Sequence, residues 1–167
     1  MKSKTFRYAF VFTLALLLSG VFSELTARPG MRFKANRVIR KTAMVLHAAG
    51  KQLKLNKHFT GNFARAVAHQ RFAKRQYMRG NFVSAIHHSR RARMLAFMVI
   101  SDNNGGAPPQ EWEFTPEEKA SAGKDNPTDA QLDNELMKDN PNLKFSDEEL
   151  MDAALDDIDV EDVANDK

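Results

Sequence analysis

The sequence predicts an all-α protein in which a small three-helix array is followed by a largely disordered acidic tail. Three observations support this fold class. Apolar residues recur at helical spacing between residues 33 and 100, and a 19-residue repeat lies within that range. The charge then reverses, because residues 28–104 carry 17 Lys or Arg and one Asp, whereas residues 105–167 carry 5 Lys and 19 Asp or Glu. The two parts therefore have net charges of +16 and −14.

Residues 1–27 have the pattern of a secretory signal peptide. Three basic residues precede an apolar run of 14 residues, Ala9 to Phe22, which is shorter than the roughly 20 apolar residues that cross a bilayer. Small residues then provide cleavage sites after Ser23 or Ala27. We therefore expect an exported protein (periplasmic, in the cell envelope or extracellular) with no stable membrane span after cleavage. An uncleaved anchor is the alternative.

Three helices are expected in the basic helical domain, residues 28–102. The first spans about residues 33–55, where apolar side chains at three- and four-residue spacing share one face. The second spans about residues 63–78 and the third about residues 82–100. The Gly80-containing turn separates the last two, because Gly accepts the left-handed conformation that ends a helix.

The repeat covers the second and third helices. Residues 61–75 align without gaps on residues 80–94, with seven identical positions. One helix and one turn form the repeated unit. Small residues lie in its apolar stripe, so we expect the two helices to pack as an antiparallel hairpin.

An aromatic-containing helix, a Gly-containing turn and a helix with small residues follow one another between residues 66 and 99. This order resembles one unit of the tetratricopeptide family, in the residues Ala73, Tyr77, Gly80, Asn81, Phe82, Ala85, Ile86 and Ala92. The resemblance implies stacked helices and a protein-binding scaffold. With at most one and a half such units, we expect a three-helix bundle and no superhelical groove. An amphipathic hairpin that converged on the same pattern is the alternative.

Residues 103–109 have the composition of a linker, and residues 110–167 form the acidic tail, whose low apolar content favours disorder. A second repeat lies in this tail, because residues 124–137 align on residues 138–151. Each of these 14-residue copies starts with a Pro-containing turn and ends in a short acidic amphipathic segment. Such short helices are marginal in water and are expected to form when a surface covers their apolar side.

Two helix starts are expected within the tail. Ser146 with Glu149 fits a capping box, and Thr115 with Glu118 forms a similar start nearer the linker. The helix that begins after Ser146 would carry an apolar stripe of Leu150, Met151, Ala154, Leu155 and Ile158.

The sequence favours a protein that is not an enzyme and has no cofactor. It contains no Cys, which excludes disulfides, thiol nucleophiles and Cys-based zinc sites, and it lacks the common nucleotide-binding and hydrolase motifs. His69 and His88 occupy equivalent repeat positions and could meet across the hairpin. Residues 28–101 offer no carboxylate to complete a metal site there, so we expect no metal.

The cations of the hairpin are the candidate residues for binding a partner or an anion. They fall mainly off the apolar stripe and predict a basic outer surface, formed by Arg71, Lys74, Arg75, Arg79, Arg90, Arg91 and Arg93. Since no acid is interleaved, their mutual repulsion predicts a polyanion nearby. It could be external, such as an acidic glycan, an envelope polymer or a nucleic acid. It could also be the tail itself, in an intramolecular contact between residues 28–104 and 105–167. The covalent connection of the two parts would favour this contact by raising the effective concentration of the tail.

The favoured interpretation is a non-catalytic exported interaction or scaffold protein. Its basic helical module would dock a protein partner that the sequence does not identify, and its acidic tail would mask the module. A polyanion-binding protein is the alternative. In a third interpretation, the acidic repeats recruit a basic partner and the helices anchor them.

Overall fold

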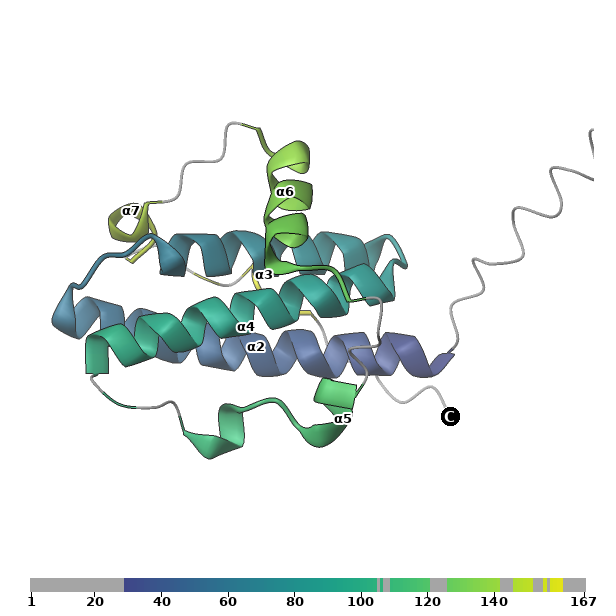
Figure 1. The fold of residues 1–167 in the computed structure, drawn as a ribbon, viewed down its shortest axis with the longest axis horizontal. Coiled ribbons are helices and arrows are strands. Elements are labelled where there is room, and N and C mark those ends of the chain that lie inside the picture. Colours follow the sequence, from purple (N-terminus) through teal and green to yellow (C-terminus); the bar gives the residue numbers. More distant parts are fainter. Residues whose placement is uncertain are drawn as a thin grey trace, which may run out of the picture.

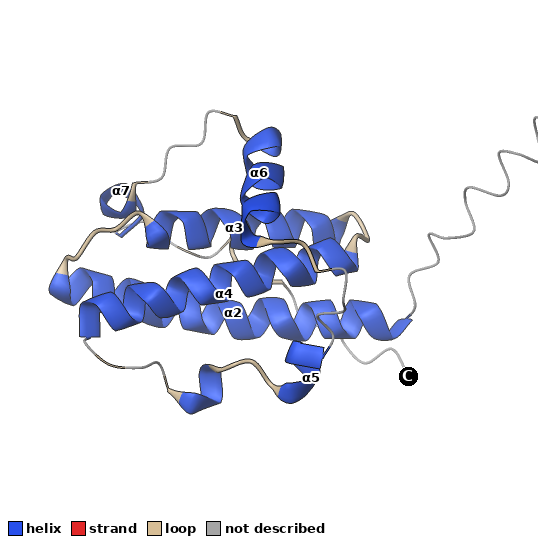
Figure 2. Cartoon of the chain, viewed as in Figure 1, coloured by secondary structure: helices blue, strands red, loops and turns tan. Residues whose placement is uncertain are grey.

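The computed structural model describes residues 29–104, 106, 109–120, 126–141, 146–151, 155 and 157–160. Within this part of the chain all regular structure is helical, which confirms the all-α fold class (Figure 2). The expected signal peptide and Ala154 of the expected apolar stripe lie outside the described residues. Among the residues that are described, no helix is both long and apolar enough to cross a membrane.

Three long helices form the body of the protein: α2 (Pro29–Asn56), α3 (Asn62–Met78) and α4 (Phe82–Asn104). They pack side by side, with α4 in extensive contact with both α2 and α3 (Figure 1). This three-helix array was expected and is compatible with a helical-repeat fold. The ends of α3 agree with the prediction to within one residue.

The other two long helices extend beyond the predicted bounds. α2 begins at Pro29, because a proline at the first helical position loses no hydrogen bond and already has a helical φ. α4 continues to Asn104, into the sequence expected to be a linker. Asn103 is buried there, and its side chain accepts a hydrogen bond from the backbone N–H of His58 at 3.0 Å and donates one to the His58 carbonyl at 3.3 Å.

The two turns of the repeat each contain a glycine with a left-handed φ. Gly61 and Gly80, at equivalent positions, have φ of +78° and +82°. A side chain is strained in this left-handed region, so glycine suits both turns. The repeated Gly-Asn-Phe sequence therefore marks a repeated turn before a helix.

The described parts of the tail contain a 3₁₀ turn, η1 (Gln110–Trp112), and three short helices: α5 (Pro116–Ala120), α6 (Asp129–Asp139) and α7 (Asp147–Met151). In Figure 1, α6 stands across α3 and α4, α7 lies near the start of α3, and α5 lies beside α2.

Each short α-helix of the tail starts at a side-chain cap. Thr115 and Glu118 exchange hydrogen bonds of 2.9 and 3.2 Å, as the sequence predicted. Glu149 donates its backbone N–H to the Ser146 hydroxyl at 3.3 Å, also as predicted. α6 begins with a further capping box at Thr128, which was not predicted from the sequence.

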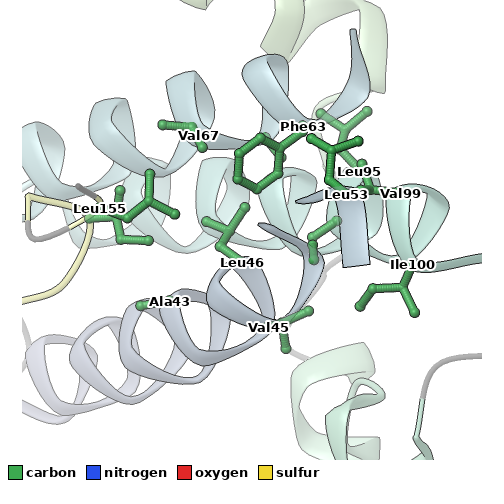
Figure 3. Packing of buried hydrophobic residues seen from close by; sticks show 14 residues of the cluster. Ala43, Val45, Leu46, Leu53, Phe63, Val67, Leu95, Val99, Ile100 and Leu155 are labelled. Atoms are coloured by element: carbon green, nitrogen blue, oxygen red, sulfur yellow. The ribbon is translucent and has the colours of Figure 1, made fainter. Parts of the chain in front are cut away.

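The largest hydrophobic cluster contains side chains from all three long helices and from the tail. Leu46, Phe63 and Leu95 are buried there together with Leu155 of the tail (Figure 3). Ile158 belongs to the same cluster and is 0 % exposed. The end of the described tail therefore completes the core of the bundle.

Candidate functional site

Two histidines meet at the centre of the repeated hairpin. Nδ1 of His69 on α3 lies 3.0 Å from Nδ1 of His88 on α4, and both side chains are buried. The next pair of equivalent residues also meets, because the Ser89 hydroxyl donates to Gln70 Oε1 at 3.0 Å. The sequence repeat predicted the approach of His69 and His88, and the structure confirms it.

The acidic tail supplies the carboxylates that the bundle lacks. Asp133 of α6 places Oδ1 at 2.9 Å from His69 Nε2, and Glu135 places Oε2 at 3.3 Å from His88 Nε2. A carboxylate only accepts, so His69 carries its proton on Nε2 and accepts at Nδ1 from His88. Nε2 of His88 is near Glu135 but is not aligned with it as a hydrogen bond.

Burial keeps this histidine pair neutral. It lowers the pKa of His69 to about 4, with a further contribution from His88, against the opposing effect of Asp133. The pKa of His88 is also lowered, chiefly by burial and against the effect of Glu135. Burial alone would raise the pKa of Asp133, but hydrogen bonds from Arg91 and His69 lower it overall, so this group is a carboxylate at neutral pH.

Two arginines complete the surroundings of Asp133. Arg91 of α4 forms two hydrogen bonds of 3.1 Å with the Asp133 carboxylate and a third of 2.6 Å with Asp129. Arg65 of α3 also donates to Asp133. Because the side chain of Arg91 is only 8 % exposed, its guanidinium depends on these carboxylates for its hydrogen bonds.

A second tail carboxylate binds the start of α3. Asp147 is 3 % exposed, and its Oδ2 accepts the backbone N–H groups of Thr60 at 2.9 Å and Gly61 at 2.7 Å. Its Oδ1 accepts the N–H of Ala64 at 2.8 Å. The N-cap residue of α3 is Gly61, which has no side chain to fill this role, so the tail provides the cap.

Asp133 and Asp147 occupy equivalent positions of the 14-residue tail repeat. Each opens a five-residue DxELM segment, defined here as residues 133–137 (Asp-Asn-Glu-Leu-Met) and 147–151 (Asp-Glu-Glu-Leu-Met). The leucines of both segments pack on the bundle. Leu136 is 1 % exposed against Phe72, and Leu150 packs against the largest core cluster.

A third contact joins α5 to the core. Arg93 is 0 % exposed and donates to Glu118 at 3.1 and 3.2 Å, to the Thr42 hydroxyl and to the Val38 carbonyl. Its guanidinium also lies 4.9 Å from the ring centre of Phe114. Burial lowers the pKa of Arg93, against the effect of Glu118.

The candidate cations therefore fall into three groups. Arg91 and Arg93 are buried, so the expectation that they lie on an outer surface is wrong; acidic partners from the tail satisfy both guanidinium groups. Arg90 is half-buried, with its guanidinium 5.2 Å from the Phe114 ring centre. The others line one surface pocket of about 430 Å³: Arg71, Lys74, Arg75 and Arg79.

Two residues of this pocket are paired with the tail. Arg71 binds Asp157 at 2.8 Å and Arg75 binds Asp139 at 2.7 Å, in ion pairs whose side chains are all about a third or more exposed. The roles of Asp133 and Asp147 were not predicted from the sequence. The signal that could have found them is the tail repeat, which places both aspartates at the same position before a Leu-Met pair.

No known protein family matches this chain, and the chain is not significantly similar to any curated protein or solved structure. Within the described part of the chain, no group of three or more His, Asp or Glu side chains is arranged to hold a metal ion. The arrangement that the site does present is a basic helical bundle with carboxylates of its own acidic tail seated on it.

Proposed function

We propose that this protein is a non-catalytic exported interaction protein. Its basic helical bundle is the docking module, and its acidic tail occupies this module until a protein partner displaces it. The observation that supports the proposal best is the environment of Asp133, a tail carboxylate whose partners Arg65, His69 and Arg91 all come from the bundle.

The contacts of α6 favour a segment that can leave without unfolding the bundle. Only Leu132 and Leu136 of this helix are buried. The Arg75–Asp139 pair at its end is partly exposed, and exposed ion pairs contribute only about 0–1 kcal/mol. Ile158, by contrast, is fully buried in the core. In this proposal α6 is displaced while the chain around Ile158 stays anchored.

Three features of the sequence support the other parts of the proposal. The signal-peptide pattern of residues 1–27 supports export. The resemblance of residues 66–99 to a tetratricopeptide unit supports a protein-binding role. The sequence lacks the nucleophile and phosphate-binding motifs of common enzyme classes, which supports a non-catalytic role.

The test uses a fluorescent peptide with the sequence of residues 126–160 and the full chain. Asp133→Asn weakens the internal contact, so the peptide should bind this variant at least tenfold more tightly than the wild type. Asn134→Ala changes an exposed neighbour and should behave as the wild type. Circular dichroism verifies that all chains are folded. Equal peptide affinity of the folded variant and the wild type would contradict a displaceable tail.

Polyanion binding is the second candidate function, and the pocket lined by Arg71, Lys74, Arg75 and Arg79 favours it. A sulfated polysaccharide is a suitable probe. Its affinity should fall steeply with added salt and at least tenfold in a Lys74→Ala, Arg79→Ala double variant. Lys51→Ala removes an exposed cation of α2 and is the matched control. A salt-independent affinity would contradict this function.

A further inference from the structure

The two DxELM segments dock on the bundle through the same two side chains. In each, the aspartate is held by polar groups of the bundle and the leucine three positions later packs on an apolar surface. Three residues is the spacing that places two side chains on one face of a helix. We define site one as the bundle surface that holds Asp133 and Leu136, and site two as the surface that holds Asp147 and Leu150.

The two sites recognise a carboxylate by different chemistry. Site one uses side chains, namely two guanidinium groups and the His69 imidazole. Site two uses three backbone N–H groups at the start of α3. The same five-residue pattern therefore fits two structurally unrelated receptors, and what it contributes to both is one carboxylate and one leucine.

Among the remaining positions, Glu135 makes one further polar contact, because its Oε2 lies 3.3 Å from His88 Nε2, although its side chain is 49 % exposed. Asn134 and Glu148 are exposed, and Met137 is 38 % exposed. Glu149 is also exposed. The contacts that both sites share are therefore those of the Asp and of the Leu three positions later.

An empty site one would require a ligand with both groups. Without Asp133, the nearly buried guanidinium of Arg91 would lose two of its hydrogen bonds to carboxylate, which is strongly unfavourable for a buried charge. Without Leu136, the ring of Phe72, now 2 % exposed, would lose its cover from the tail. A simple inorganic anion would satisfy the guanidinium and leave the ring uncovered.

We propose that the partner of this protein presents a short acidic helical segment with Asp and Leu three residues apart, and that this segment replaces residues 133–137 at site one. This proposal rests on the displaceable tail described above and specifies the chemistry of the partner. A second copy of the chain carries the same segments, but its tail would gain no new contact over the tethered one, whose effective concentration is of millimolar order. A different protein whose acidic segment forms a more stable helix than the tail does would bind site one more tightly than the tail.

The experiment uses full-length chains and a fluorescent peptide of residues 126–141. The receptor is the Asp133→Asn, Leu136→Ala chain, in which the internal segment is weakened at both positions. The native peptide should bind it at least tenfold more tightly than it binds the wild-type chain. Peptides with Asp133→Asn or Leu136→Ala should each lose at least tenfold in affinity, and a peptide with Asn134→Ala should bind as the native one.

Three results would overturn the proposal. The first is equal binding of the native peptide and of the peptides with Asp133→Asn or Leu136→Ala. The second is competition by polyglutamate as strong as competition by the native peptide, because polyglutamate has the charge without the leucine. The third is dimerisation of the receptor variant in light scattering, reversed by the native peptide, which would make a second copy the occupant of site one.

A folding control and a comparison of the long and short peptides show which proposal a negative result contradicts. If the double variant is unfolded by circular dichroism, the single Asp133→Asn chain, which keeps Leu136, replaces it as receptor. If the long peptide of residues 126–160 binds but the native and the substituted short peptides bind equally, the proposal about Asp and Leu fails, and the displaceable tail stands. If neither peptide binds a folded receptor, the displaceable tail fails as well.

Discussion

Nδ1 of His69 and Nδ1 of His88, at equivalent positions of the 19-residue repeat, lie 3.0 Å apart. Since α3 and α4 form an antiparallel hairpin, equivalent residues meet only near a local two-fold axis across the pair. Gln70 and Ser89 form the next such contact. Only one proton fits between the two rings, so charging both would oppose two N–H groups and force the rings apart.

This arrangement predicts that acid destabilises the protein. The folded-state pKa of His69 is lowered from 6.5 to about 4, so the unfolded chain binds the proton more tightly. The stability contributed by the neutral ring is present above pH 6.5 and is lost as the pH falls toward 4, with a total effect on the order of 3 kcal/mol. The titratable and charged groups that face the pair are Arg65 of α3, His87 and Arg91 of α4, and Asp133 and Glu135 of α6.

Urea unfolding at several pH values between 7.5 and 4 measures this effect. His69→Gln removes the titrating ring. The free energy of unfolding should therefore decrease less in this variant than in the wild type between pH 6.5 and about 4. His47→Gln changes an exposed histidine of α2 and should leave the pH profile unchanged. A profile that is equally steep in His69→Gln and the wild type would contradict the assignment to His69.

Asp147→Ala should destabilise the protein by about 1–3 kcal/mol, because three backbone N–H groups at the start of α3 lose their acceptor. The midpoint of urea unfolding measures the change. Glu148→Ala alters the exposed next residue and should shift the midpoint little. Hydrogen exchange adds a local readout, since the Ala64 amide should lose protection in Asp147→Ala before the rest of α3. Unchanged protection of Ala64 would argue against the cap.

Ile158→Ala should cost about 2–5 kcal/mol, the usual range for truncating a fully buried aliphatic side chain. The reason is that this tail residue lies in the largest core cluster with Leu46 and Phe63. Thermal unfolding by circular dichroism measures it, with Met98→Ala, at a side chain 45 % exposed, as the control. An effect no larger than that of the control would mean that the tail end covers the bundle without being part of its core.

Arg93→Ala should destabilise the protein by about 3–5 kcal/mol, since it leaves Glu118 without its buried partner. Replacing both members of the pair, as Arg93→Met with Glu118→Gln, should recover much of that loss, because no buried charge is left unpaired and glutamine can keep the hydrogen bond with the Thr115 backbone. Denaturant unfolding of the single and double variants measures the difference. Arg79→Ala, at an exposed position, should stay within about 0.5 kcal/mol of the wild type. A double variant less stable than Arg93→Ala would contradict the pairing argument.

Local features of this protein were predictable because their causes are local. Apolar spacing predicted the three long helices, and Gly80 marked the turn between the second and third. Thr115 and Ser146 were expected as helix caps, and both cap a short helix in the structure. In each of these cases the deciding contacts join residues a few positions apart, so the chain order contains the information.

The burial of the cations was not predictable in the same way. Helical spacing places Arg91 and Arg93 off the apolar stripe, yet both are buried because Asp133 and Glu118 of the tail cover them. Charge alone predicted attraction between the basic domain and the acidic tail. Charge alone did not predict which carboxylate pairs with which cation, because Coulomb attraction is long-ranged and does not depend on how the two segments are aligned.

The sequence by itself determined the helical fold class and the bounds of α3, and it indicated that His69 could meet His88. Only the tertiary structure decided that Asp147 caps α3 and that Ile158 completes the core. The physical reason is the distance along the chain. A cap or a turn is formed by neighbours, whereas these two contacts depend on where a tail more than 80 residues farther along crosses the finished bundle.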